Sequence, residues 1–236
     1  MSGKNNKKRI AIILSGCGGM DGSETHEAIS LMIAIKNEGA DYECFALNEN
    51  QKYVINGNAK LGIKQQTNEK RNMLFEAGRL NHGMVNDLQN LDVDKFDGLV
   101  FPGGYGTGTS LSNFITCDKE KCNRNFDYNV RDEIKNVIRK FHNQEKPIFA
   151  GCLAHVLVNG SLSGIILMMD EGKYTAEAVE KNGNFYEIKK AGEICIDEKN
   201  KIITAPFYMT PKVAINVIFD ESVKAIKALI KMCKSI

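Results

Sequence analysis

The stretch KPIFAGCLAH, residues 146–155, predicts a buried strand that turns sharply into a helix. PIFAG (147–151) is a short apolar run, as in strands that are covered on both faces. Ala150 and Ala154 flank Cys152 at a spacing of two, and small residues there suit a strained turn that projects a nucleophile. Cys152 is therefore a candidate nucleophile. The alternative is a small core residue, because free cysteine is often buried.

Similar apolar runs recur along the chain and alternate with longer helical patterns. The runs expected as strands are RIAIIL (9–14), YECFAL (42–47), GLVFPG (98–103), PIFAG (147–151) and GIILMM (164–169). Helices are expected near 22–37, 69–80, 127–143 and 211–233, the last with Pro211 in its first turn. EICIDEKNKIITA (193–205) indicates a β-hairpin around EKN. The alternation predicts an α/β fold, a mostly parallel sheet with helices on both faces.

The composition is that of an ordinary globular chain. Of the 236 residues 43% are apolar, and 31 basic residues against 29 acidic ones give a net charge of +2. This balance predicts neither a nucleic-acid nor a membrane partner. We expect one domain over 1–236, with 1–8 as a flexible basic tail. No leader segment fits before RIAIIL and no apolar run approaches about 18 residues, so we expect a soluble, cytoplasmic protein.

Seven cysteines without a secretory signal predict reduced thiols. Cys117 and Cys122 are the closest pair, but the DKEK between them fits no strong zinc pattern and no histidine pair completes it. We therefore expect no metal, and the sequence indicates no cofactor.

Three loops that leave predicted strands are rich in glycine and small polar residues. They are SGCGGMDGSE (15–24), PGGYGTGTS (102–110) and GCLAH (151–155). Because ligands of parallel sheets bind beyond the carboxyl ends of the strands, the loops should meet at one rim and form the site. The residues expected in a substrate pocket there are Ser15, Gly16, Glu24, Gly103 and His155. A Cys152–His155 pair would permit conventional catalysis, although a spacing of three does not ensure contact.

The segment DGSETHEAISLMIAIK (21–36) places carboxylates on the apolar face of a helix. Asp21 or Ser23 can cap this helix, and Asp21 with Glu24 has the spacing of a capping box. Glu24 and Glu27 share a face with the apolar positions, whereas His26 lies opposite and is expected at the surface. An enclosed Glu27 would have a raised pKa and could act as acid and base beside Cys152. The alternative is that both acids only favour the helix dipole.

The remaining loop and the turn after Cys152 supply backbone donors. PGGYGTGTSLSNF (102–114) contains GxGxG but has neither Rossmann spacing nor a Walker lysine. We expect the N–H groups of Gly104 and Leu153 to form an oxyanion hole. A helix N-terminus after Cys152 would lower the pKa of its thiol. A plain flexible turn, or a cradle for a flavin or nucleotide phosphate, is the alternative for this loop.

Five segments together resemble a known family. They are ILSGCGGMDGSETHEA (13–28), RNMLFEAGRL (71–80), FPGGYGTGTSLSNF (101–114), KPIFAGCLAH (146–155) and DEKNKIITAPFYM (197–209). They are similar to segments of the ElbB-like branch of the ThiJ/PfpI superfamily, which is related to class I glutamine amidotransferases. The resemblance runs from about residue 9 to 209 in the same order, and GSExHEA and NKIxTxPxYM are specific to this branch.

The resemblance implies a flavodoxin-like three-layer α/β sandwich that forms a homodimer. It implies Cys152 as nucleophile, Glu27 as partner acid and Gly104 as oxyanion-hole glycine. Bacterial members of the branch are linked to glyoxalase activity without glutathione, which converts 2-oxoaldehydes to hydroxy acids, and older labels tie them to isoprenoid biosynthesis. Animal relatives are mitochondrial, so mitochondria or another organelle are the alternative location.

The sequence also departs from its wider relatives. Amidotransferases place a triad histidine near the chain end, but here that region is TAPFYMTPK (204–212) and no histidine follows His155. We therefore do not expect glutaminase activity. Leu153 stands where related peptidases and stronger glyoxalases carry histidine, and His155 replaces a proline.

Two hypotheses follow from the sequence. The first is a glyoxalase-type enzyme for a small aldehyde such as methylglyoxal, with Cys152 adding to the aldehyde and Glu27 moving a proton between carbons. The second is a non-enzymatic redox sensor or small-molecule-binding protein, in which Cys152 is readily oxidised.

Overall fold

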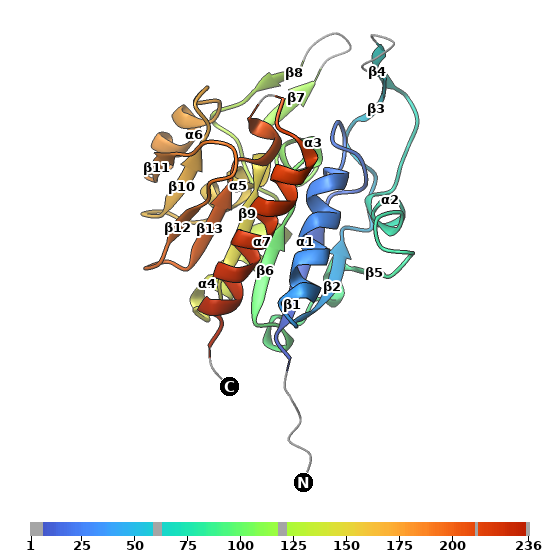
Figure 1. Cartoon of the computed structure of the whole chain (residues 1–236). Coiled ribbons are helices and arrows are strands. Elements are labelled where there is room, and N and C mark those ends of the chain that lie inside the picture. The colour runs from blue at the N-terminus through green and yellow to red at the C-terminus, as the bar shows by residue number, and fades with distance from the viewer. Residues whose placement is uncertain (1–6, 59–62, 118–121, 211, 235–236) are drawn as a thin grey trace.

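A seven-stranded sheet forms the centre of the molecule (Figure 1). The computed structural model describes residues 7–58, 63–117, 122–210 and 212–234. The strand order is β12-β13-β9-β6-β1-β2-β5, and every neighbouring pair is parallel except β12–β13. Along the chain the strands are β1 (Arg9–Leu14), β2 (Asp41–Ala46), β5 (Val85–Asp87), β6 (Gly98–Phe101), β9 (Ile148–Gly151), β12 (Cys195–Asp197) and β13 (Ile202–Ala205).

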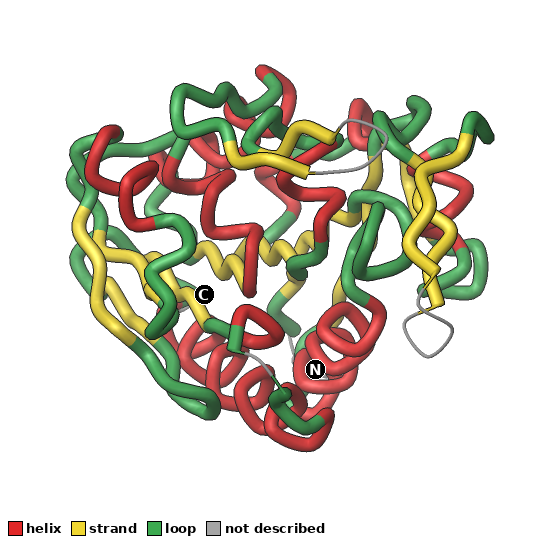
Figure 2. The backbone as a smooth tube through the Cα atoms, turned by 90° about the horizontal axis from the view of Figure 1, so that it is seen from above, coloured by secondary structure: helices red, strands yellow, loops and turns green. Residues whose placement is uncertain are grey.

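Helices cover both faces of this sheet. α1 (Thr25–Asn37) and α7 (Ile215–Met232) pack together on one face, and α4 (Asp132–Asn143) and α5 (His155–Asn159) cover the other. Figure 2, which views the molecule from above, shows the strands running between these two helical layers. The shorter helices are α2 (Met73–Gly78), α3 (Tyr105–Thr109) and α6 (Ala176–Lys181). The predicted flavodoxin-like three-layer sandwich is confirmed.

The central strands are the continuous apolar runs that the sequence indicated. Ile10 to Leu14 of β1 and Leu99 to Phe101 of β6 are all at most 1% exposed, because helices lie on both sides. The strands expected at 9–14, 42–47, 98–103 and 147–151 lie in the sheet, and the expected hairpin at 193–205 is β12–β13. Pro211 lies outside the described residues, and α7 begins at Ile215.

The expectation for GIILMM (164–169) needs correction. It forms β10 (Ile166–Met169), which pairs with β11 (Phe185–Ile188) in a separate two-stranded sheet. Two backbone N–H groups of β10 donate hydrogen bonds to side chains of the main sheet. The Met168 N–H donates to Thr204 Oγ1 at 2.7 Å, and the Ile166 N–H donates to Asp197 Oδ2 at 2.8 Å. With those donors occupied, β10 packs beside β12 and β13 without joining their ladder.

Two further hairpins were not expected from the sequence. They are β3 (Val54–Asn58) with β4 (Ile63–Thr67), and β7 (Ile115–Cys117) with β8 (Cys122–Arg124). The register of the second hairpin places Cys117 opposite Cys122, and the two form a disulfide. The expectation of reduced thiols is therefore wrong for this pair, whereas the other five cysteines are free. No helix among the described residues is long and apolar enough to span a membrane.

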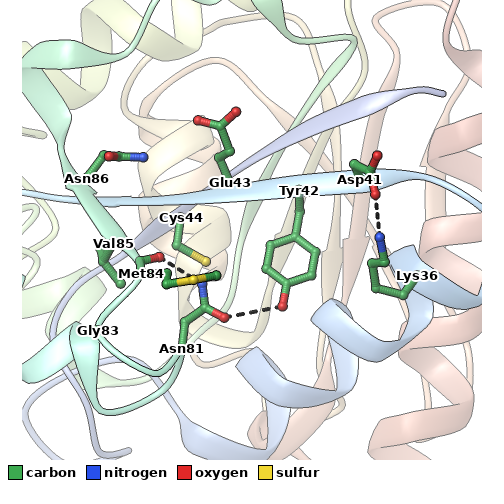
Figure 3. A pocket seen from close by; sticks show the side chains of 10 residues that line it. All are labelled: Lys36, Asp41, Tyr42, Glu43, Cys44, Asn81, Gly83, Met84, Val85 and Asn86. Atoms are coloured by element: carbon green, nitrogen blue, oxygen red, sulfur yellow. Dashed lines mark hydrogen bonds and ion pairs between the residues drawn. The ribbon is translucent and has the colours of Figure 1, made fainter. Parts of the chain in front are cut away.

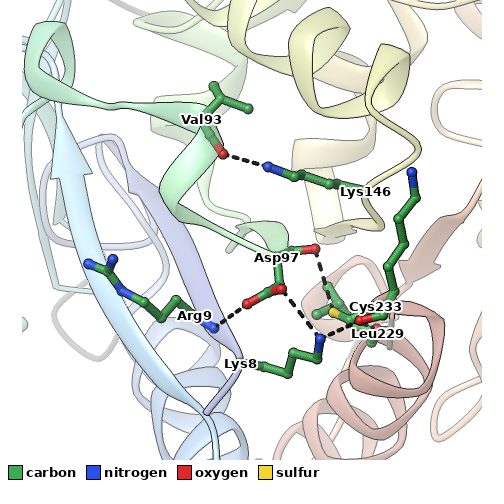
Figure 4. Close-up of polar contacts among 8 residues, drawn as sticks. Lys8, Arg9, Val93, Asp97, Lys146, Leu229 and Cys233 are labelled. Atoms are coloured by element: carbon green, nitrogen blue, oxygen red, sulfur yellow. Dashed lines mark hydrogen bonds and ion pairs between the residues drawn. The ribbon is translucent and has the colours of Figure 1, made fainter. Parts of the chain in front are cut away.

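The amino ends of the strands are tied to the chain termini by Asp97 (Figure 4). Its Oδ2 accepts the Arg9 N–H at 2.8 Å, its Oδ1 lies 3.4 Å from Lys8 Nζ, and its carbonyl accepts the Cys233 thiol at 3.5 Å. Residues 1–6 of the predicted tail lie outside the described residues, and Lys8 of that tail takes part in this ion pair.

Candidate active site

Cys152 stands on a strained turn at the carboxyl end of β9. Its φ is +49°, in the left-handed region that residues with a Cβ rarely adopt. The chain then enters a 3₁₀ turn, η4 (Cys152–Ala154), and continues into α5. Ala150 and Ala154 are fully buried, and a Cβ at Gly151 would lie 2.4 Å from the Phe207 ring. This is the geometry of a nucleophile elbow, in which larger neighbours would clash.

The glycine-rich loop after β6 closes against this elbow. A Cβ at Gly103 would lie 2.4 Å from Cys152 Cβ, and one at Gly104, whose φ is +101°, would lie 2.3 Å from the Gly22 carbonyl oxygen. The three loops therefore meet at one rim, and glycine is required because their backbones touch. A Cβ at the neighbouring Gly106 would lie 2.4 Å from Ser15 Oγ.

Glu27 lies beneath the elbow and is fully buried. Its Oε2 accepts the Gly103 N–H at 2.8 Å, while its Oε1 has no hydrogen-bond partner of ordinary geometry. Burial first, and then the charge of Glu24, raise the pKa of Glu27 to about 8. The Gly103 and Tyr208 N–H groups and the Cys152 thiol lower the pKa in part. Glu27 is therefore a protonated acid at neutral pH, beside the candidate nucleophile.

The start of α1 differs from the expectation. Glu24 is the N-cap, and its Oε2 accepts the Glu27 N–H at 2.8 Å. The two residues predicted as caps bind other segments and do not cap the helix. Ser23 Oγ accepts the Ser15 N–H and Asp21 Oδ2 accepts the Ile55 N–H, both at 2.8 Å. The loop before the helix is thus fixed by tertiary contacts, and local capping propensity does not decide its conformation.

The thiol of Cys152 is not the low-pKa thiolate that was expected. Burial, followed by the charge of Glu27, raises its pKa well above the ordinary value. The N–H groups of Leu153 and Gly104 lower the pKa but are outweighed. α5 has only five residues and η4 precedes it, so the helix end contributes little. The two expected oxyanion-hole donors therefore lie beside the sulfur, which is a thiol at rest.

His155 does not enter the pocket that was expected to contain it. It is fully buried, with Nδ1 2.6 Å from the Cys152 carbonyl oxygen and Nε2 2.6 Å from Thr175 Oγ1. Burial lowers the pKa of His155 to about 4, so the ring is neutral and holds the elbow in place. Ser15, Gly16 and Gly103 also lie outside the pocket lining, whereas Glu24 is part of it.

A cavity of about 360 Å³ opens over Cys152. Its lining residues are Gly19, Glu24, Gly104, Tyr105, Cys152, Leu153, Asp170, Gly172, Tyr174, Tyr208 and Met209. This set contains three tyrosines and two carboxylates but no lysine, arginine or histidine. Sequence reasoning missed the tyrosines and Asp170, although Tyr105 and Tyr208 stand inside the motifs PGGYG and PFYM.

A larger cavity, of about 700 Å³, lies at the far edge of the sheet beside β2 and β5 (Figure 3). Its wall is held by a hydrogen bond of 3.3 Å from the Tyr42 hydroxyl to Asn81 Oδ1 and by an ion pair between Lys36 and Asp41. It also contains Cys44, but burial raises the pKa of that thiol to about 12. We assign the site to the Cys152 cavity, because there the thiol stands on a strained turn beside a fully buried carboxylic acid.

A three-layer α/β sandwich with a cysteine elbow over a buried glutamate defines a class I glutamine amidotransferase-like protein. Curated relatives show the particular family. The chain is 34% identical to the human "Glutamine amidotransferase-like class 1 domain-containing protein 3, mitochondrial", over 90% of this chain and 78% of that protein. It is 34% identical to the rat "ES1 protein homolog, mitochondrial", over 86% of this chain and 76% of that protein. The chain therefore belongs to the glutamine amidotransferase-like class 1 domain (ES1) family, although no family model matches it.

Solved structures agree with this assignment. An isoprenoid biosynthesis protein with an amidotransferase-like domain from Ehrlichia chaffeensis superposes with a TM-score of 0.82 at 30% identity, over 94% of this chain and 99% of that one. A ThiJ/PfpI domain protein from Brachyspira murdochii has a TM-score of 0.56 at 14% identity, over 96% and 99%, and shares the fold. The curated relatives are named as mitochondrial, which matches the alternative location and gives no support to a cytoplasmic one.

Proposed function

We propose that this protein is a glyoxalase-type enzyme that converts small 2-oxoaldehydes such as methylglyoxal to hydroxy acids without glutathione. The observation that carries the proposal is the strained Cys152 at the floor of a small cavity, with a protonated, buried Glu27 beside it. We also place the chain in the ElbB-like branch, which the motifs GSETHEA and NKIITAPFYM support. The names of its relatives favour a mitochondrial location, and cell fractionation would test it.

The first step joins the sulfur to the aldehyde carbon, C1. Loss of one proton from the Glu27–Cys152 pair leaves a carboxylate that takes the thiol proton as the sulfur–carbon bond forms. The negative charge moves to the aldehyde oxygen, O1, near the N–H groups of Gly104 and Leu153 that adjoin the sulfur. Glu27 then returns the proton to O1. The product is a hemithioacetal, and Glu27 is again a free base.

The second step is an isomerisation on the enzyme. Glu27 removes the hydrogen from C1 and delivers it to C2, the former ketone carbon, through an enediol. C1 becomes the carbonyl of a thioester and C2 carries a hydroxyl group, so no external oxidant is needed. Water then adds to the thioester, the sulfur–carbon bond breaks, and Cys152 takes one proton of the water. Lactate leaves, and the other proton is released to solvent.

The charge of the lining supports an uncharged substrate. Glu24 and Asp170 line the cavity, and none of the described residues that line it is a lysine, arginine or histidine. A 2-oxo acid, or the carboxylate of glutamine, would meet like charge without a counter-ion. Both ring nitrogens of His155 are occupied, by the Cys152 carbonyl oxygen and by Thr175 Oγ1, so this histidine cannot complete an amidotransferase triad. The site therefore favours small neutral carbonyl compounds.

The redox-sensor hypothesis has less support in the resting site. Oxidation by peroxide proceeds through the thiolate, and the raised pKa of the Cys152 thiol keeps that form scarce. We therefore treat sensing as an outcome that the test below can reveal.

The test is lactate formation from methylglyoxal without glutathione, at pH 8.5. We expect wild type and Cys44→Ser to turn over and Cys152→Ser to be inactive, because Cys44 lies in the other cavity. A 2-oxoaldehyde that also carries a carboxylate should react at least about tenfold more slowly than methylglyoxal as a result of its charge. A wild type no faster than Cys152→Ser would contradict the proposal, and selective oxidation of Cys152 by peroxide would then favour sensing.

A further inference from the structure

The proposed isomerisation moves two protons, and Glu27 accounts for only one of them. The hydrogen on C1 must reach C2, which is the task of Glu27. The second transfer is between the oxygens. O1 loses a proton as it becomes the thioester carbonyl, and O2 gains one as it becomes the product hydroxyl. While Glu27 carries the carbon-bound hydrogen it cannot serve the oxygens. A second proton-transfer group is therefore required, and this inference rests on the proposed function.

Two motifs that are far apart in the sequence meet at the cavity. GSETHEA (22–28) contains His26, and NKIITAPFYM (200–209) contains Tyr208, 182 positions further along the chain. His26 Nδ1 lies 2.9 Å from the Tyr208 hydroxyl, and the centroids of the two rings are 5.9 Å apart. Tyr208 lines the same cavity as Cys152, and the His26 side chain is 50% exposed. The pair therefore connects solvent with the site.

The backbone around Tyr208 is held rigidly. Tyr208 belongs to the 3₁₀ turn η5 (Phe207–Met209), which follows β13, and the buried Phe207 has a φ of +47°. The Phe207 N–H contacts the buried carboxyl of Glu221 on α7, and the Tyr208 N–H contacts the carboxyl of Glu27. The turn that presents the Tyr208 ring thus also contacts the proposed acid and base.

We propose that Tyr208 is the second proton-transfer group of the site and that His26 positions its hydroxyl. As Glu27 removes the hydrogen from C1, negative charge develops on O2 and the Tyr208 O–H donates its proton there. The phenolate then takes the proton from the hydroxyl at O1, which becomes the thioester carbonyl. Tyr208 ends the cycle unchanged, so every proton is accounted for.

The charges around Tyr208 fit the role of a donor. Burial, followed by the charges of Glu24 and Glu27, raises the pKa of its hydroxyl, so it is protonated before reaction. His26 Nδ1 also lies 3.7 Å from Oε1 of Glu24, which lines the same cavity. A ring nitrogen that donates to the Tyr208 oxygen leaves the O–H free to reach the substrate.

The experiment measures two products of methylglyoxal: lactate, and the Cys152 adduct, scored as protection of the thiol from iodoacetamide. For Tyr208→Phe we expect kcat to fall by about 100-fold while protection of Cys152 persists. His26→Leu should give a similar loss, and His26→Asn, which keeps a polar atom near the Nδ1 position, should restore much of the rate. His26→Leu should add little to Tyr208→Phe, because the two residues act as one unit. Tyr186→Phe and His142→Leu, outside the site, are matched controls, and thermal unfolding checks folding.

The outcomes separate the inference from the proposed function. If wild type makes neither lactate nor the adduct, the proposed function fails and the inference fails with it. If wild type is active and Tyr208→Phe keeps its full rate, only the inference is overturned. If folded Tyr208→Phe loses protection of Cys152 as well as lactate, Tyr208 is a wall of the binding site and the inference is again wrong.

Discussion

The two ends of the central sheet are built in opposite ways. At the amino end, Asp97 uses both carboxylate oxygens and its carbonyl to bind Arg9, Lys8 and Cys233. At the carboxyl end, Glu27 Oε1 is buried without a hydrogen-bond partner of ordinary geometry, and Cys152 and Phe207 have positive φ values. Satisfied polar groups stabilise a fold, whereas unpaired ones and strained backbone lower stability. The comparison shows that the amino end of the sheet stabilises the fold, while the carboxyl end retains reactive groups.

The largest effect should come from Glu27→Gln at the carboxyl end. Turnover of methylglyoxal should fall by about 100-fold or more, since an amide cannot accept the proton. In wild type, kcat/KM should rise with pH to a plateau above about 8, as the Glu27–Cys152 pair loses a proton. A pH–rate profile of both proteins measures this, and an unchanged rate in the variant would remove Glu27 from the mechanism.

The same substitution should change the pH dependence of stability. The pKa of Glu27 is about 8 when folded and ordinary when unfolded, so only the folded state holds the proton between these values. Its contribution is complete below the unfolded pKa and is lost as the pH rises through about 8. Glu27→Gln should therefore gain stability over wild type between pH 5 and 9, on the order of 4 kcal/mol at most.

Urea unfolding at several pH values would measure that gain. Glu221, whose pKa burial raises to about 7, adds a similar trend to both proteins, so the difference between them is diagnostic. A constant difference across this range would show that Glu27 is ionised in the folded protein.

A smaller effect, confined to stability, is expected at the amino end. Asp97→Ala removes the acceptor of the Arg9 N–H and should lower the free energy of unfolding by about 1–2 kcal/mol without changing turnover. Asp127→Ala, which breaks an exposed ion pair with Lys181, is the control and should cost less than about 0.5 kcal/mol. Loss of activity in folded Asp97→Ala would contradict the division of roles between the two ends.

The smallest effect should reveal the strain at the elbow. At Cys152, with φ +49°, we expect Cys152→Gly to be more stable than Cys152→Ala by about 1 kcal/mol, because glycine adopts this conformation freely. Ala154 has helical backbone angles, with φ −64° and ψ −18°, so Ala154→Gly should instead destabilise the protein by about 1 kcal/mol. Thermal unfolding of the three variants tests the contrast, and a more stable Cys152→Ala would show that the turn is unstrained.

The sequence by itself determined the sheet, the elbow and the meeting of the loops. Continuous apolar runs such as RIAIIL and PIFAG are typical of strands that are buried on both faces. The carboxyl ends of parallel strands lie at the same edge of the sheet. The small residues around Cys152 and the place of Glu27 on the apolar face of its helix were also visible locally. These features depend on spacings of only a few residues.

Tertiary structure decided the features that depend on distant neighbours. Enclosure by Glu27 and the surrounding protein keeps Cys152 a thiol, although a helix start alone predicts a thiolate. Thr204 and Asp197 keep β10 out of the main sheet, and contacts with Cys152 and Thr175 turn His155 away from the cavity. Tyr208 meets His26 across 182 positions. Desolvation and hydrogen-bond partners are set by whichever segments fold together, and no local pattern in the chain specifies them.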